Sequence, residues 1–156
     1  MSAEFGALLR KQRRERSMNT IKDEFRIQAP ASKVYAALTT EAGYRGWWNK
    51  VAEVGASIGE QAKLHFIKDG HPVTMRYQID DLTSNQRVLW SCFAHDFPEW
   101  VGTMLSWQLR EAGDTTLVSL EHSGWKAPPP EPVKLGWKHF CGSLKAYVET
   151  GKGEPW

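Results

Sequence analysis

The chain of 156 residues is 41% hydrophobic and 24% charged, which suits one globular domain that folds without disulfide or metal support. Its net charge of +2 is uneven, because residues 1–20 carry five Arg and Lys against two Glu while the remaining residues sum to −1. A nearly neutral domain without a long apolar stretch gives no basis for nucleic-acid binding by its folded surface or for membrane insertion.

The basic segment 1–19 is predicted to be a separate N-terminal arm, and residues 20–156 are predicted to form the domain proper. A short helix could form in the arm. One interpretation is a tether to nucleic acid or another acidic surface. The other is a solvated, disordered extension, or a stretch that precedes a start at Met18. Like charges crowded between residues 10 and 16 favour the solvated extension.

Residues 20–28 alternate between apolar and polar side chains, which is the pattern of a strand buried on one face. Pro30 and Ser32 are typical of a helix start, so a short helix is predicted from there to Leu38. A second helical turn is predicted over residues 41–45. Two short helices therefore follow the first strand.

From residue 55 onward, turn residues separate short alternating segments, which is the pattern of an antiparallel meander. The pairs Asp69-Gly70 and Ser84-Asn85 are turn signals. The predicted strands cover residues 61–68, 73–80, 87–93, 100–111 and 115–123.

Residues 132–150 have the length and apolar period of one long helix. Pro132 suits the first turn, and Gly151 suits the left-handed residue that closes a helix. The bulky face of this helix needs a cover, and a sheet is the simplest one. If the helix packs closely at Gly136, a bulky replacement there should harm folding.

This order predicts an α+β fold: a curved antiparallel sheet of about six or seven strands wrapped around the long C-terminal helix, with two short helices after the first strand. The sheet has one apolar face and the helix has one apolar stripe. If the sheet curls more strongly than the helix can fill, a cavity remains between them, lined by inward strand residues.

Five segments, in the expected order, carry a family resemblance across residues 20–154. The first resembles the opening strand and helix of START-like (SRPBCC, helix-grip) proteins, and the others are similar to the bacterial branch named after the activators of the heat-shock protein 90 ATPase, with its link to stress response. The resemblance implies a deep, mostly apolar cavity, but no fixed reaction. The segments are 27–40 (IQAPASKVYAALTT), Trp47-Trp48, 85–90 (NQRVLW), 115–124 (TTLVSLEHSG) and 136–153.

His122 is the first polar candidate for the cavity. It shares a side of the last strand with Val118 and Leu120, so its ring could face the helix and orient a ligand oxygen. The alternative is a core histidine satisfied by its neighbours. Tyr77 has the same two interpretations, as a phenol offered to a ligand or as a core side chain.

Aromatic side chains are the other candidates, because a cavity lining is a special case of a core. Eight tryptophans are many for this length, and six of them, including Trp47 and Trp125, could line the cavity. The predicted ligand-binding residues are Trp48, Phe66, Tyr77, Trp90, Trp107, His122, Trp137 and Phe140.

The sequence predicts neither a metal, a cofactor nor covalent catalysis. The five histidines lack the paired spacing of zinc sites, and no G-x-S-x-G elbow occurs. Cys92 and Cys141 lie far apart, and no secretory segment is present. We therefore expect a cytoplasmic protein in which both thiols are reduced and buried.

Three functions follow as hypotheses. The leading one is a cytoplasmic binding protein for a small apolar or aromatic ligand. The second is a cavity enzyme of cyclase or hydrolase type, less favoured, in which Asp23, Glu121 or His122 would move a proton and a pocket group would have a strongly shifted pKa. The third is an interaction module for a chaperone or other protein, with an exposed apolar patch and a small closed cavity.

Overall fold

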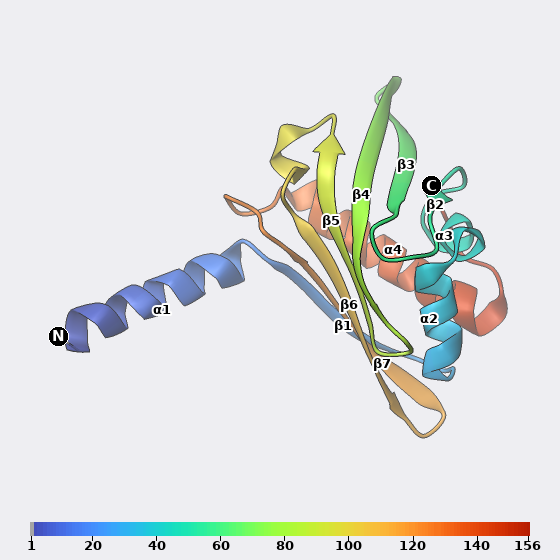
Figure 1. Ribbon diagram of the computed structural model, residues 1–156, viewed down its shortest axis with the longest axis horizontal. Helices are drawn as coiled ribbons and strands as arrows, with labels where there is room; N and C mark the ends of the chain where they lie inside the picture. Colours follow the sequence, from blue (N-terminus) through green and yellow to red (C-terminus); the bar gives the residue numbers. More distant parts are fainter. Residues whose placement is uncertain (1) are drawn as a thin grey trace.

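The computed structural model describes residues 2–156, with one N-terminal helix ahead of the predicted succession of elements (Figure 1). Two short helices follow the first strand, and a six-stranded meander leads to the last helix. The elements are α1 (Ser2–Met18), β1 (Ile21–Ile27), α2 (Ala31–Thr39), α3 (Glu41–Trp47), β2 (Glu53–Val54), β3 (Gln61–Lys68), β4 (His71–Thr83), β5 (Arg87–His95), the 3-10 helix η1 (Pro98–Trp100), β6 (Met104–Ala112), β7 (Thr115–Ser123) and α4 (Glu131–Thr150).

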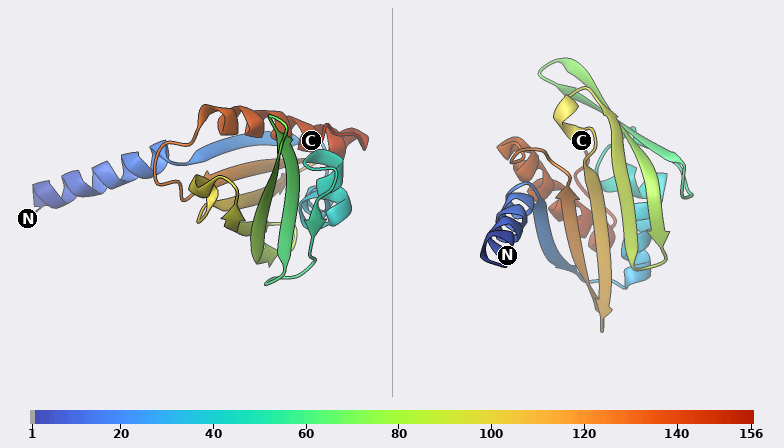
Figure 2. Two further views of the ribbon diagram at one scale, coloured as in Figure 1. Left: turned by 90° about the horizontal axis from the view of Figure 1, so that it is seen from above. Right: turned by 60° about the vertical axis from the view of Figure 1, so that its left-hand side comes forward.

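All seven strands form one antiparallel sheet in the order β1-β7-β6-β5-β4-β3-β2. Consecutive strands are neighbours except at one edge, where β1 pairs with β7 and Phe25 lies opposite Val118. The sheet is curved, and α4 lies across one of its faces (Figure 2). The predicted α+β fold, with its sheet around a C-terminal helix and two short helices after the first strand, is therefore confirmed.

Two strands, β4 and β6, differ from their predicted bounds by three or more residues at one end. β4 is longer than predicted because a bulge at Asp80 lets the ladder continue past it. The strand predicted to start at residue 100 is wrong at its beginning, since β6 starts at Met104. Pro98 starts a 3-10 turn, and Gly102 has a left-handed backbone (φ +91°) that ends it, so Val101 is exposed instead of facing the core.

The helix ends follow the sequence signals. Pro132 lies in the first turn of α4, and Gly151 closes this helix in the left-handed conformation, donating its N–H to the carbonyl of Tyr147. The hydroxyl of Thr40 caps α3 by accepting from the N–H of Gly43 at 3.0 Å. These contacts set the start of α3 and the end of α4.

The N-terminal segment forms α1, which projects away from the rest of the fold (Figure 1). Its side chains from residue 3 onward are almost all exposed, among them Phe5 at 60%, Leu8 at 50% and Leu9 at 38%. Of the forms considered for this arm, the structure describes a helix. In the part of the chain that is described, every helix is too short or too polar to cross a membrane.

The core contains many large rings, and the polar atoms of two of them, Tyr44 and Trp47, are paired. Tyr44 and Trp47 of α3 are fully buried, and the rings of Tyr44 and Trp90 lie 4.7 Å apart. The Tyr44 hydroxyl donates to the carbonyl of Leu38 at 2.7 Å, and the Trp47 indole donates to the carbonyl of Ala37 at 2.9 Å. Each such ring removes about 150–250 Å² from water, so α2 and α3 are held firmly on the sheet.

Candidate functional site

A pocket of about 210 Å³ lies between the strands β3 to β5 and the N-terminal half of α4. Apolar and aromatic side chains form most of its wall, and only two lining residues, a lysine and a histidine, are titratable. The lining consists of Trp48, Phe66, Lys68, Val73, Met75, His95, Phe97, Trp100, Pro132, Val133, Gly136, Trp137, Phe140 and Trp156.

Four of the predicted ligand-binding residues meet at this pocket: Trp48, Phe66, Trp137 and Phe140. The Trp48 ring lies 5.2 Å from that of Trp137 and 6.4 Å from that of Phe140. Behind it, Trp47 stacks on Trp48 at 5.6 Å with 14° between the planes. Because these rings support one another, this part of the wall is formed in advance of any ligand.

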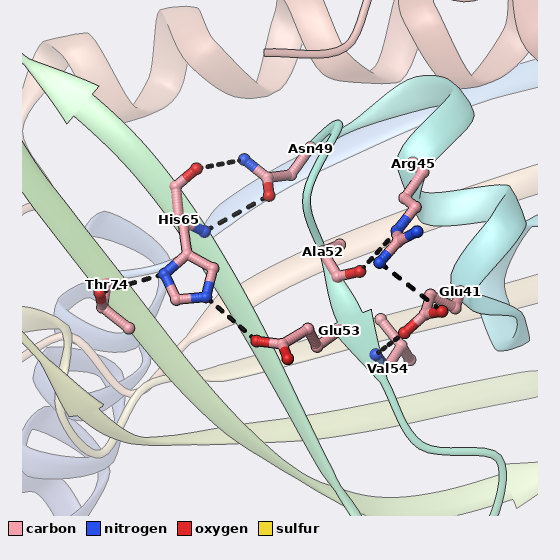
Figure 3. A network of polar contacts seen from close by, with 8 residues as sticks. All are labelled: Glu41, Arg45, Asn49, Ala52, Glu53, Val54, His65 and Thr74. Atoms are coloured by element: carbon pink, nitrogen blue, oxygen red, sulfur yellow. Dashed lines mark hydrogen bonds and ion pairs between the residues drawn. The ribbon is translucent and has the colours of Figure 1, made fainter.

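The segment that carries Trp48 is attached to β3 by Asn49 (Figure 3). The Asn49 amide donates from Nδ2 to the carbonyl of His65 at 2.7 Å and accepts the His65 N–H at Oδ1 at 3.3 Å. Asn49 is fully buried, and the pair of bonds imitates one step of a strand ladder. It places Trp48 next to Phe66, the residue after His65.

The same edge of the sheet holds α3 through charged groups (Figure 3). Arg45 donates from Nε to the carbonyl of Ala52 at 2.8 Å, and Glu41 accepts the N–H of Val54 at 3.1 Å. Glu41 and Arg45 also pair across 3.7 Å. These contacts hold the segment between α3 and β2, which contributes Trp48 to the aromatic wall of the pocket.

Trp156 completes the pocket wall from the end of the chain. Its N–H donates to the carbonyl of Trp48 at 2.8 Å, and its carbonyl accepts from the N–H of Lys50 at 2.9 Å. Its ring lies 4.6 Å from Phe66 and stacks on Phe140 at 6.4 Å. The indole is nevertheless 53% exposed, so it forms the outer part of the wall.

His95 and the turn after it form the polar end of the pocket. The Nδ1 atom of His95 accepts the N–H of Phe97 at 2.8 Å, and the ring stacks on Trp100 at 4.6 Å. Burial lowers the pKa of His95 to about 4, against the opposing effect of Asp96 and Glu99. The ring is therefore neutral at pH 7 and carries its proton on Nε2.

Lys68 stands beside this end, at the tip of the hairpin between β3 and β4. Its ammonium lies 5.0 Å from the centre of the Phe97 ring, within cation–π range. The side chain is exposed and makes no ion pair within the described residues. The pocket therefore has one positive charge at its rim.

His122 lies outside the pocket lining and is fully buried. Its Nδ1 accepts from the indole of Trp137 at 3.0 Å, which leaves the proton on Nε2 to be donated to the hydroxyl of Thr103 at 3.1 Å. That hydroxyl donates to the carbonyl of Trp100 at 2.6 Å. Burial lowers the pKa of His122 to about 3, so the ring is a neutral, satisfied core histidine.

The remaining three predicted residues support the pocket from beneath. Tyr77 is fully buried, its hydroxyl contacts the Met75 sulfur at 3.5 Å, and burial raises the tyrosine pKa well above its usual range. Trp90 packs 5.5 Å from Tyr77, and Trp107 packs 6.0 Å from Trp137. None of the three appears in the pocket lining within the described chain.

Gly136 faces the pocket from the middle of α4. A Cβ atom added there would meet no heavy atom within 4 Å, so close packing does not occur at this residue. The expectation that a bulky replacement harms folding depended on close packing of the helix at Gly136, and this close packing is absent. Gly136 instead leaves room for the pocket.

Groups for other chemistry are not assembled in the described residues. No three His, Cys, Asp or Glu side chains come close enough to hold a metal ion. Glu121 points outward, where it pairs with Lys22 at 3.6 Å. Both cysteines are free and buried, as predicted, and burial raises the pKa of Cys92 to about 11 and that of Cys141 further.

Several lining residues escaped the sequence reasoning. Val73 and Met75 could have been found, because they alternate onto the same face as Tyr77. Val133 likewise shares the stripe of Trp137 on α4. The segment 95–100 and Trp156 have no period that predicts their position, since turns and backbone pairing place them.

Comparison with known proteins points to one family. Residues 28–149 match the family described as Activator of Hsp90 ATPase homolog 1-like protein. The Aha1 of Colwellia psychrerythraea, solved in solution as a dimer, is 29% identical, with a TM-score of 0.72 over 86% of this chain and 98% of that one. No curated protein sequence matches significantly.

More distant structures share the fold. A Chromobacterium violaceum protein, 23% identical, has a TM-score of 0.73 over 84% of this chain and 97% of its own. A START superfamily protein from Mycobacterium smegmatis, 17% identical, has a TM-score of 0.68 over 85% of this chain and 99% of its own. The helix-grip architecture and a match over most of the sequence agree, and the chain therefore belongs to the Activator of Hsp90 ATPase homolog 1-like family.

Proposed function

We propose that this protein binds a small apolar or aromatic molecule in the pocket between the sheet and α4. The observation that carries the proposal is the wall itself, in which Trp48, Trp137 and Phe140 are packed together around open space. A preformed apolar pocket with few polar groups is the usual form of a small-molecule site. A cytoplasmic location is part of the proposal, supported by the two free, buried cysteines.

The volume limits the size of the ligand. A cavity of about 150 Å³ accepts benzene, and sites for drug-sized ligands usually measure about 300–1,000 Å³. At about 210 Å³, this pocket suits one aromatic ring with a short substituent. Removing about 100 Å² of ligand surface from water would contribute roughly 2–3 kcal/mol.

Binding is favoured over catalysis by the chemistry of the lining. A pocket histidine with a shifted pKa is the feature expected of a cavity enzyme, and His95 has one. Its shift is downward, to about 4, so at pH 7 the ring is a weak base with little capacity to accept a proton. No Asp or Glu side chain lies in the pocket lining among the described residues.

Native mass spectrometry followed by denaturing extraction tests the proposal first, because it detects a ligand that purifies with the protein. Titration with one-ring aromatic probes follows. The blocking variant is Gly136→Leu, whose side chain would project into the pocket, and the matched control is Gly142→Leu on the exposed part of the same helix.

We expect Gly136→Leu to weaken probe binding at least tenfold and Gly142→Leu to leave it unchanged. Both variants should fold, since replacing a helical glycine gains helix propensity, about 1 kcal/mol. A protein that carries no ligand and binds none of the probes would overturn the proposal. So would a Gly136→Leu variant that binds them as well as the wild type.

A second candidate function is self-association through α1. Phe5, Leu8 and Leu9 are exposed on this projecting helix, and the Aha1 of Colwellia psychrerythraea is described as a dimer. Analytical ultracentrifugation tests it with the double variant Phe5→Ser, Leu8→Ser. A dimer that dissociates in this variant but persists in Leu135→Ser, which removes an exposed apolar side chain from α4, would support it. A monomeric wild type would exclude it.

A further inference from the structure

We propose that the ligand carries a carboxylate, held at the end of the pocket where Lys68 and His95 lie. This inference rests on the proposed function and specifies the class of ligand. Its basis is an asymmetry of the lining, in which the two titratable side chains both belong to the end formed by the β3–β4 hairpin and the chain around η1. A pocket that is apolar except at one end suits an apolar molecule with a single hydrogen-bond acceptor group at one end.

His95 supplies a donor whose orientation is fixed. Its Nδ1 is occupied by the N–H of Phe97, so the ring proton lies on Nε2, and Nε2 makes no hydrogen bond within the described chain. Stacking on Trp100 and packing against Phe97 hold the plane of the ring. A neutral imidazole fixed in this way donates one hydrogen bond and favours an acceptor atom in the ligand.

Lys68 decides between a charged and a neutral acceptor. Its ammonium lies over Phe97, the same ring that packs against His95, and forms no ion pair with a described residue. A carboxylate that reached both groups would form an ion pair with the ammonium in addition to a hydrogen bond, whereas an amide or alcohol would gain only the hydrogen bond. The lysine stays at the solvent rim, so binding does not require its complete desolvation.

The surrounding charges argue for one negative charge instead of two. Asp96 and Glu99 act on His95 but do not line the pocket, and Asp96 already accepts the N–H of Thr74 at 3.1 Å. Glu131, in the first turn of α4, pairs with Lys134 at 3.9 Å. With acidic groups this close, a phosphate dianion would be repelled more strongly than a carboxylate.

The test compares two probes that differ only at the polar group: 3-phenylpropanoate and 3-phenylpropanamide, titrated by isothermal calorimetry at pH 7. We expect wild-type protein to bind the carboxylate about 3–10-fold more tightly, as one partly exposed charged hydrogen bond contributes on the order of 1 kcal/mol. The preference should shrink as salt is added.

Lys68→Gln should abolish this preference by lowering the affinity for the carboxylate, whereas Lys68→Arg should keep the preference. Lys138→Gln is the matched control, because it removes the same charge from an exposed residue of α4 outside the pocket lining. Loss of the preference in that variant too would make it a general charge effect and overturn the inference.

The two proposals fail in different ways. Equal affinity of wild-type protein for the acid and the amide would overturn the carboxylate inference and leave the apolar pocket standing. If neither probe binds the wild type, the inference fails. The proposed function fails as well only if the protein also carries no ligand and binds none of the other one-ring aromatic probes. His95→Phe should weaken both probes, since either one can accept from Nε2, and unchanged affinities would remove His95 from the site.

Discussion

Trp137 of α4 donates its indole N–H to Nδ1 of His122 on β7, across 3.0 Å and in a fully buried position. The bond fixes the tautomer of the imidazole, whose Nε2–H then reaches Thr103. A single chain of hydrogen bonds therefore joins the helix to the sheet and, through the hydroxyl of Thr103, to η1. It carries no charge, so it gains stability without desolvating an ion.

Thr103→Val should destabilise the protein by about 1–3 kcal/mol, because the shape is kept while the buried His122 Nε2–H loses its acceptor. The Trp100 carbonyl loses one of its two donors and keeps the N–H of residue 103. Urea denaturation measures the change. Thr103→Ser is the control, since it retains the hydroxyl and should cost less. Equal loss in both variants would attribute the effect to packing instead of hydrogen bonding.

Stability should decrease as the pH falls from 6.5 to 5. The pKa of His122 is about 3 and that of His95 about 4 in the folded protein, below the value of about 6.5 for an unfolded histidine. In this window the unfolded chain binds more protons, so acid favours unfolding, with a limiting slope of about 1.4 kcal/mol per pH unit for each histidine.

The control for this pH dependence is His95→Gln, which should remove one of the two contributions and keep that of His122. Urea denaturation at several pH values between 5 and 7.5 gives the slope. A free energy of unfolding that does not change across this window would contradict the buried, neutral state of both rings.

The fold was predictable because its signals are local and periodic. Alternation identified β1 and β3, and Pro132 with Gly151 marked the ends of α4 to within one residue. The start of β6 was not predictable in this way. Val101 continues the apolar alternation, but Gly102 turns the backbone away, and the turn chemistry decides the outcome.

The site was predictable only in part. Periodicity indicates which face of an element a side chain lies on, but not whether that side chain lines an open pocket or fills the packed core. Tyr77 and Met75 share one face of β4, yet only Met75 reaches the pocket. Gly136 illustrates the same limit on the helix, because the open space beside it depends on how far α4 lies from the sheet, which the sequence pattern does not give. His95 and Trp156 are placed by backbone contacts that no spacing encodes.

Asn49→Ala should destabilise the protein by about 1–3 kcal/mol, because it leaves the N–H and carbonyl of His65 without their side-chain partner. Asn49→Asp should be worse, since a buried carboxylate would face that carbonyl. Urea denaturation measures both, with the exposed Gln61→Ala on the same strand as control. An Asp variant as stable as wild type would contradict the bonding of Nδ2 to His65.

Ser143→Ala should release the end of the chain from the pocket. The Ser143 hydroxyl donates to the carbonyl of Trp47 and accepts the N–H of Glu154, both at 2.7 Å, so it ties segment 152–156 to the aromatic wall. Without it, the Trp156 N–H, bonded to Trp48, should exchange with solvent at least tenfold faster.

The Ser143→Ala variant should also bind apolar probes more weakly, because the Trp156 ring covers the outer part of the pocket against Phe66. Hydrogen exchange followed by NMR measures the exchange rate of the Trp156 N–H, and calorimetry measures the affinity for the probes. Ser84→Ala, in an exposed turn, is the control and should change neither. If exchange at Trp156 accelerates while affinity stays constant, the segment is held by Ser143 but does not contribute to binding.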